Sequence, residues 1–267
     1  THRRGAGQYT VKIPESRHDE FGQLARDFNG LAVILAQNEK LRRDFVADIS
    51  HELRTPLAIL AGEIEAIQDG IRPATPAALA SLQHETQSLT RLVDDLYQLA
   101  LSDIGGLRYS MQRLDLVELV QRAAQPFFER MAEHDLSLTV NLPKQPIWVD
   151  ADRARLHQLI TNLLENSTRY TNAGGVVQLS LQQTATCAIL DCQDSAPSVT
   201  VQDLPRLFER LYRVEGSRNR ATGGAGLGLP LCQSIIDAHH GTINAKASPQ
   251  GGLWLQVELP LSLPTPS

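Results

Sequence analysis

The chain lacks an apolar run long enough to cross a membrane. Its longest unbroken apolar stretch runs from about Leu31 to Ala36, whereas a membrane helix needs roughly 18–20 such residues. We therefore expect no part of this chain to span a bilayer. The chain begins with Thr1 and has no signal-peptide pattern, so we expect it to be a piece of a longer protein, with any membrane region upstream.

Cysteine and clustered positive charge are also scarce. The three cysteines, Cys187, Cys192 and Cys232, form no CxxC pair and leave one over in any pairing. This pattern argues against a disulfide or zinc framework and favours reduced thiols in the cytoplasm. The formal net charge is -5, and no block of Lys and Arg is long enough to neutralise a run of phosphates, which argues against a nucleic-acid partner.

What the chain has is helical periodicity over its first hundred residues. Its 267 residues are 42% hydrophobic and 21% charged, which is typical of a soluble protein with more than one domain. Apolar residues recur every three or four positions over 21–35 and 41–71, a third helical stretch with one seven-residue gap spans 79–99, and breakers occupy 70–76. The last two stretches should fold into an antiparallel hairpin, and two hairpins would form the four-helix bundle of a homodimer.

From Leu114 the pattern changes to shorter helices mixed with strands. We predict helices over 116–132, 154–170 and 227–238, and strands over 136–142, 176–181, 188–192, 242–247 and 253–259. This order indicates an α+β sandwich with helices on one face of the sheet.

A histidine on the second helical stretch stands beside a carboxylate. His51 is followed by Glu52, and a neutral imidazole is available as a nucleophile because the ordinary pKa of His is about 6.5. Glu52 can take the ring proton or fix the tautomer. The motif is not the zinc-protease HExxH, because its fifth position is Thr55. Without further context, His51 is one of eight histidines on a polar helix face.

Two other segments carry polar groups suited to a nucleotide. Asn162 and Asn166 share a helix face with Arg169 nearby, and amide oxygens can ligate Mg²⁺ while a guanidinium contacts phosphate. Taken alone, a solvated helix face explains them equally well. A glycine loop over 223–229 feeds a helix and can cradle phosphate, but it lacks the P-loop lysine and misses the GxGxxG spacing.

The order and spacing of these segments resemble the transmitter region of bacterial sensor histidine kinases. The matching boxes are the H-box at His51, the N-box from Asn162 to Thr171, G1 at Asp194, the F-box at Phe208 and G2 from Gly224 to Leu229. The resemblance implies an ATP-binding domain of the Bergerat type, phosphorylation of His51 from Mg-ATP, transfer to a response regulator, a homodimer, and membrane attachment through missing upstream segments.

The resemblance also implies roles for single residues. His51 would be the phosphoacceptor, Glu52 its base, and Thr55 the residue that positions water for phosphatase action. Asn162 and Asn166 would hold Mg²⁺. The ATP-binding residues would be Asn162, Asn166, Arg169, Tyr170, Asp194, Phe208, Arg210, Arg213, Gly224, Gly226, Leu227, Gly228 and Leu229.

The implied domains are a partial HAMP relay over 1–37, a dimerisation and phosphotransfer hairpin over 38–103, a linker over 104–113, the catalytic domain over 114–262 and a tail over 263–267.

The chain departs from the family pattern at G1, where Ala196 and Ser198 replace the two glycines of Asp-x-Gly-x-Gly. If either position needs a positive φ, we expect strain of about 1–3 kcal/mol. A scaffold or phosphatase-only protein, or a chaperone-like ATPase, therefore remains an alternative.

Overall fold

The computed structural model describes residues 19–103, 106–214 and 225–262. The chain divides into two compact units, Thr1–Thr86 and Gln87–Ser267, and each is described by itself. Within the described ranges, no helix combines the length and the apolarity that crossing a membrane requires.

The first unit is built on one long helix. α2 (Glu20–Gln68) is continuous over 49 residues and runs on through Pro56, so the first two periodic stretches of the sequence share a single helix. No Gly or Pro lies between these stretches to interrupt it. The helix ends at Gly70, whose φ of +71° is the left-handed conformation that glycine adopts at a helix C-terminus without steric cost.

The turn after α2 leads the chain back along it. Arg72 pairs with Glu63 of α2 at 3.2 Å, and Thr75 caps α3 (Pro76–Asp103) by accepting the Ala78 N–H through its hydroxyl. Ser81, in the second turn of α3, donates to the same Glu63 carboxylate at 3.3 Å. The start of α3 therefore lies against the end of α2, as the predicted hairpin requires.

The second unit contains a five-stranded sheet with helices on one face. Its strands are β2 (Ser137–Asn141), β4 (Val176–Gln183), β5 (Cys187–Ser195), β6 (Thr242–Ala247) and β7 (Gly251–Pro260). Their order is β2-β4-β5-β7-β6, and the β2–β4 pair is parallel while the other pairs are antiparallel. A separate antiparallel ribbon joins β1 (Gln112–Asp115) to β3 (Trp148–Ala151).

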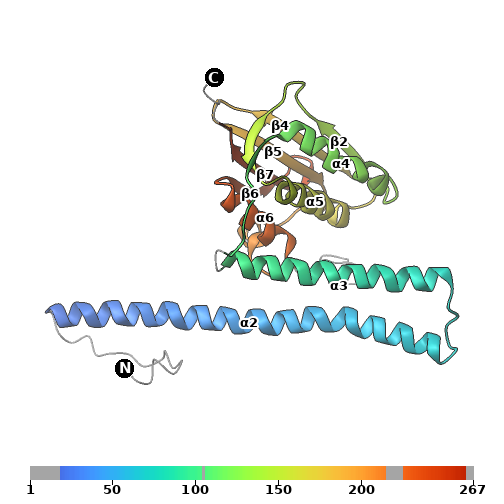
Figure 1. The fold of residues 1–267 in the computed structure, drawn as a ribbon, viewed down its shortest axis with the longest axis horizontal. Coiled ribbons are helices and arrows are strands. Elements are labelled where there is room, and N and C mark those ends of the chain that lie inside the picture. Colours follow the sequence, from blue (N-terminus) through green and yellow to red (C-terminus); the bar gives the residue numbers. More distant parts are fainter. Residues whose placement is uncertain (1–18, 104–105, 215–224, 263–267) are drawn as a thin grey trace. The chain divides into compact units, whose positions relative to one another are not determined.

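Three helices cover the sheet, and a short 3-10 helix precedes the last of them. The three helices are α4 (Leu116–Ala132), α5 (Arg153–Tyr170) and α6 (Gly228–Ala238), and the 3-10 helix is η1 (Leu204–Phe208). Figure 1 shows α4 and α5 over one side of the strands. The core lies between the two layers and includes Leu163 and Leu164 of α5, Leu190 of β5 and Val257 of β7, each at most 2% exposed. The predicted α+β sandwich is confirmed.

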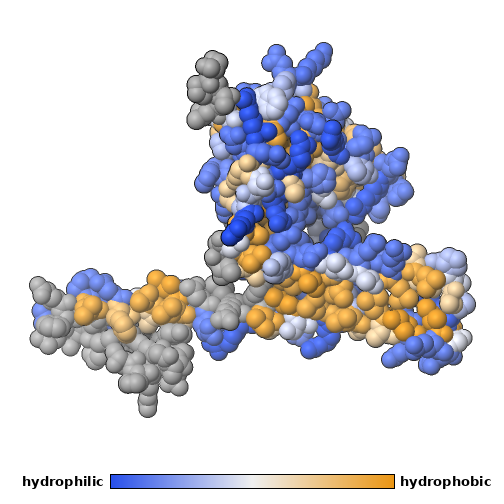
Figure 2. Space-filling view, in the orientation of Figure 1, coloured by the Kyte–Doolittle hydropathy of each residue, from blue (hydrophilic) through white to orange (hydrophobic). Residues whose placement is uncertain are grey.

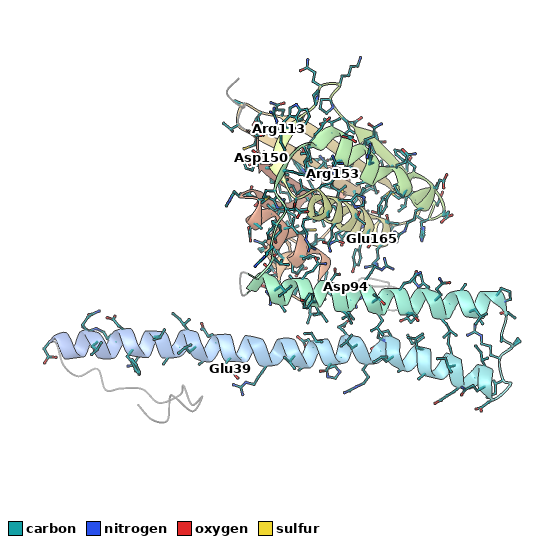
Figure 3. All side chains as sticks on the ribbon, viewed as in Figure 1. Glu39, Asp94, Arg113, Asp150, Arg153 and Glu165 are labelled. Carbon is teal, nitrogen blue, oxygen red and sulfur yellow. The ribbon has the colours of Figure 1, made fainter. Side chains whose placement is uncertain are left out.

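The second half of α3 packs on this sandwich. Leu99 is 2% exposed and belongs to the sandwich core. Arg91 donates to Glu165 of α5 at 3.3 Å, and Arg155 of α5 donates to Gln98 at 2.7 Å. Figure 3 labels Glu165 on α5 and Asp94 on α3. Because Leu99 is buried on α5 and α6, this part of α3 belongs to the same compact unit as the sandwich.

Asp95 is a half-buried carboxylate in this helix contact. Burial, followed by the carboxylates of Glu165 and Asp94, raises its pKa to about 6 against the opposing effect of Arg91. The thiol of Cys232 on α6 lies near Asp95, and burial raises the pKa of that thiol to about 12, so it stays neutral. Asp95 is therefore held between like charges with one partly compensating cation.

We expect Asp95→Asn to raise the melting temperature at pH 8 and to leave it nearly unchanged at pH 4. The folded pKa lies above the ordinary value of about 3.9, so the folded state binds more protons than the unfolded state between about pH 4 and pH 6. Stability is therefore lost as the pH rises through this window. The full cost, at most about 3 kcal/mol at 1.36 kcal/mol per pKa unit, is present above it.

Thermal melting followed by circular dichroism at both pH values measures this effect. Asp94→Asn, at the exposed neighbouring position, is the matched control and should change the melting temperature much less. An Asp95→Asn chain that melts at the wild-type temperature at pH 8 would contradict the prediction.

Candidate functional site

The predicted phosphoacceptor lies on the surface of α2. His51 is exposed, and Glu52 and Leu53 beside it are half-buried. Thr55 is also exposed, and its hydroxyl donates to the His51 carbonyl at 3.4 Å. His51, Glu52 and Thr55 thus occupy one turn and a half of helix in the first compact unit, while the predicted ATP-binding residues belong to the second.

The predicted N-box lies on α5, which begins at a firm cap. Asp152 caps the helix by accepting the N–H groups of Ala154 and Arg155. Asn162, Asn166, Arg169 and Tyr170 are all half-buried on this helix, whereas Leu163 and Leu164 point into the core. The polar residues therefore share the border of the helix and are not directed into the sheet.

The glycine loop and the start of α6 lie beside this face. Asn162 Nδ2 donates to the Gly228 carbonyl at the outer limit of a hydrogen bond, 3.5 Å. The N-cap of α6 is Leu227, which provides no side-chain hydrogen bond to the first N–H groups. Those N–H groups and the helix dipole are the features that bind phosphate at a helix N-terminus.

Gly226 fixes the approach of the loop that follows the F-box. Its φ is +68°, and a Cβ there would lie 2.9 Å from the Tyr212 carbonyl oxygen. The Leu211 N–H donates to the Gly226 carbonyl at 3.0 Å. The segment that carries Arg213 therefore runs next to G2, with Arg213 itself half-buried. Gly224 falls outside the described residues.

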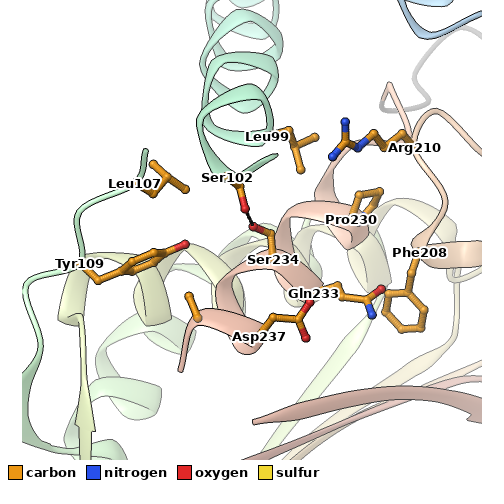
Figure 4. A pocket seen from close by; sticks show the side chains of 11 residues that line it. Leu99, Ser102, Leu107, Tyr109, Phe208, Arg210, Pro230, Gln233, Ser234 and Asp237 are labelled. Atoms are coloured by element: carbon orange, nitrogen blue, oxygen red, sulfur yellow. Dashed lines mark hydrogen bonds between the residues drawn. The ribbon is translucent and has the colours of Figure 1, made fainter. Parts of the chain in front are cut away.

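Phe208 and Arg210 line a pocket of about 450 Å³ on the other side of α6. Figure 4 shows this pocket, with Ser102 of α3 hydrogen-bonded to Ser234 of α6 and with Tyr109 and Asp237 on its wall. Neither Asn162 nor Asp194 lines this pocket. The roles of Phe208 and Arg210 at the nucleotide therefore stay predictions, as do those of Leu227 and Leu229.

Asp194 is the buried carboxylate at the end of β5, with an exposed fraction of 5%. Its Oδ1 accepts the Leu253 N–H of β7 at 2.6 Å, and its Oδ2 accepts the Ser167 hydroxyl of α5 at 2.9 Å. Burial raises its pKa to about 6, although both donors lower it. An ionised carboxylate has about four lone-pair sites, so two remain for a ligand.

The departures at G1 carry no strain of the anticipated kind. Among the described non-glycine residues, positive φ occurs at Asp135, Leu211 and His240, and so not at Ala196 or Ser198. Alanine and serine are therefore accommodated in ordinary backbone conformations. The strain that a positive φ at these two positions would have caused is therefore absent.

Three family models match successive parts of the chain. They are the HAMP domain over 1–36, the "His Kinase A (phospho-acceptor) domain" over 41–105 and the "Histidine kinase-, DNA gyrase B-, and HSP90-like ATPase" over 151–263. Signal transduction histidine-protein kinase BaeS of Escherichia coli K12 is 54% identical over 98% of this chain. The chain belongs to the sensor histidine kinases. It spans 56% of the length of BaeS.

Other relatives of this histidine kinase chain agree with that assignment. The sensor protein SrrB of Staphylococcus aureus NCTC 8325 is 32% identical over 83% of the chain, which covers 38% of SrrB. The solved structure of the Acinetobacter baumannii histidine kinase AdeS matches with a TM-score of 0.66 and 27% identity, covering 80% of this chain and 98% of that one. The family assignment predicted from the boxes is confirmed.

The residues of this histidine kinase site fit a nucleotide. The Thr171 hydroxyl, at the end of α5, is a buried polar atom without a hydrogen-bond partner. A Cβ on Gly252 would lie 2.3 Å from Asp194 Oδ1, so glycine is needed for the close approach of β7. Together with the uncapped start of α6, these groups offer an orphan hydroxyl, an acceptor and phosphate-binding N–H groups.

Two residues of the site were missed from the sequence. Ser167 lies inside the N-box but has no role among the sequence-based predictions, and Gly252 is not among the predicted site residues. Both act through tertiary contacts with Asp194 across long chain separations. A signal for Gly252 was present in its pairing with Gly251, whereas nothing in the local pattern distinguishes Ser167.

Proposed function

We propose that the chain is the catalytic portion of a membrane-anchored sensor kinase that phosphorylates His51 from Mg-ATP and passes the phosphoryl group to an aspartate of a response regulator. The observation that carries the proposal is an exposed imidazole next to Glu52 in one unit, together with polar groups of α5, β5 and α6 suited to a nucleotide in the other. Membership in the histidine kinases supports it.

At His51 the chemistry is a phosphoryl transfer to nitrogen. One ring nitrogen attacks the γ-phosphorus, the bond to the bridging oxygen of ADP breaks, and the proton on the other ring nitrogen passes to a base. Glu52 is the neighbouring carboxylate suited to accept that proton. Exposure of His51 lets the γ-phosphate reach it without displacing packed side chains.

At the nucleotide, the chain contributes mainly position and charge. Asn162 and Asn166 supply amide oxygens for Mg²⁺, and Arg169 supplies a cation for the phosphates. Bound Mg²⁺ would neutralise the phosphate charge that builds up during transfer. Asp194 accepts a hydrogen bond from the adenine amino group, and Tyr170 lines the base pocket. Support for these roles comes from the location of all five residues along α5 and the end of β5.

The proposed homodimer rests on apolar side chains that the first unit leaves uncovered. Val46, Leu57 and Ile64 of α2, which share one helix face, are 44–56% exposed, and Leu79 of α3 is 56% exposed. Figure 2 shows apolar surface along the hairpin helices. A second hairpin would cover this stripe and form a four-helix bundle.

Phosphatase action on the regulator is a further part of the proposal. Thr55 lies one helical turn after His51 and presents its side chain at the surface, where its hydroxyl can orient a water molecule. The HAMP match and the likeness to BaeS support attachment to the inner membrane through upstream segments.

Incubating the full chain with γ-labelled ATP and Mg²⁺ tests the proposed function. The expected product is protein-bound label that is stable in alkali and lost in acid, as a phosphoramidate is, and that moves to a receiver domain when one is added. Steady release of free phosphate with no label on the protein would instead favour the ATPase alternative.

A further inference from the structure

Ser167 is an unusual serine for a helix interior. Serine and threonine within helices commonly donate back to the carbonyl four residues earlier, and the next residue, Thr168, does so, to Leu164 at 2.7 Å. Ser167 is 1% exposed, and its hydroxyl instead donates to Asp194 Oδ2 at 2.9 Å. The side chain therefore joins α5 to the end of β5.

A buried thiol completes the arrangement around Ser167. Cys192 Sγ lies 3.6 Å from Ser167 Oγ. Because the Ser167 proton is directed at the carboxylate, the thiol is the donor in this pair. Burial raises the pKa of the Cys192 thiol to about 12, so it keeps its proton near neutral pH. The two hydrogen bonds therefore run in one direction, from the Cys192 thiol to the Ser167 hydroxyl and from that hydroxyl to the Asp194 carboxylate.

The other side of Asp194 is held equally firmly. The Leu253 N–H donates to Oδ1 at 2.6 Å, and the absence of a side chain on Gly252 lets the β7 backbone reach it. The pKa of Asp194 is raised by burial and lowered by the hydrogen bonds from the Leu253 N–H and the Ser167 hydroxyl, and no charged side chain among the described residues contributes to the shift. The neighbouring thiol on β5 is neutral. Among the residues that the structure describes, Ser167 is thus the one side-chain donor that counters the effect of burial on the Asp194 pKa.

We propose that Ser167 is a positioning residue for adenine: its hydroxyl holds the Asp194 carboxylate oriented and ionised, so that it accepts the 6-amino group of the base. The inference rests on the proposed binding of ATP. An ionised acceptor forms the stronger hydrogen bond with an amino donor, and a buried carboxylate without this hydroxyl would take up a proton at higher pH.

The test compares ATP with the triphosphate of purine riboside, which lacks the 6-amino group. Calorimetry on the full chain with Mg²⁺ gives both affinities from pH 5.5 to 9. Both ligands carry the same triphosphate, so the effect of its titration on affinity cancels in the ratio of the ATP affinity to the purine riboside triphosphate affinity. In the wild type, the ratio should rise with a midpoint near the Asp194 pKa of about 6. Losing a hydrogen bond to a charged group should move that midpoint up by about one pH unit or more in Ser167→Ala.

The predicted difference is largest near pH 6.5. There, about three-quarters of a carboxyl with a pKa of 6 is ionised but about a quarter of one with a pKa of 7, so the adenine preference should fall about threefold in Ser167→Ala. The preference should recover by about pH 9, where a carboxyl with a pKa of 7 is almost fully ionised. Thr168→Val, which removes the adjacent buried hydroxyl without touching Asp194, is the matched control and should keep the wild-type midpoint.

Three outcomes are distinguishable. A Ser167→Ala chain with the wild-type midpoint would overturn the inference while leaving ATP binding intact. A wild-type chain that binds neither nucleotide would overturn the proposed function and this inference with it. If Ser167→Ala does not fold, the pair Ser167→Thr and Ser167→Val, which differ chiefly by the hydroxyl, replaces it: the inference then requires the higher midpoint in the valine variant.

Discussion

Replacing His51 with glutamine is expected to abolish labelling of the chain by γ-labelled ATP. Glutamine keeps a polar side chain of similar length but has no nucleophilic ring nitrogen. Removing a reacting nucleophile costs about a thousandfold or more in rate, which places the signal at background. Because His51 is exposed on α2, the substitution should leave the melting temperature and the affinity for ATP unchanged.

A second exposed histidine provides the control for this result. His84 lies on α3 and is also exposed, so His84→Gln removes an imidazole from the same hairpin and should keep full labelling. Acid-labile label that persists in His51→Gln would place the phosphoacceptor elsewhere. Label lost equally from both variants would point to damage of the hairpin and not to chemistry at one residue.

The elements with strong local signals were predicted closely. The predicted helix over 116–132 matches α4 (Leu116–Ala132), and the strand over 242–247 matches β6 (Thr242–Ala247). In α4 the apolar period coincides with an Asp115 side chain that caps the helix. The ribbon of β1 and β3 was missed because each strand has four residues, too few to establish an alternating pattern.

The association of α3 illustrates a different limit. The apolar period of residues 79–99 predicts which face of the helix is buried but not what covers it. The structure places Leu99 in the core of the ATP-binding sandwich, and the compact unit begins at Gln87 within the predicted hairpin. The predicted domain bounds stay a prediction, because a compact unit of the structure and a sequence domain need not share their bounds.

The site shows the same division between local and long-range information. Asn162 and Asn166 could be predicted as candidates because a four-residue spacing on a helix is visible in the sequence. The environment of Asp194 was not, because it depends on α5, β5 and β7 meeting at one point. The strain anticipated at Ala196 was excluded by its backbone conformation, which sequence alone does not provide.

Asp194→Asn is expected to weaken ATP binding about 100-fold near pH 7.5. The exchange replaces one carboxylate oxygen by an NH₂ group of the same size, and a hydrogen bond to a charged group is worth about 1.5–3 kcal/mol, or roughly 10- to 150-fold in Kd. The amide oxygen can still accept the Leu253 N–H, and the NH₂ can donate to the Ser167 oxygen. The fold should therefore survive, and thermal melting checks this.

Asp191→Asn is the matched control, since Asp191 is a buried carboxylate on the same strand that accepts from Trp254 and Gln256. Calorimetry that finds the Asp194→Asn and Asp191→Asn chains binding ATP equally would remove Asp194 from the adenine site.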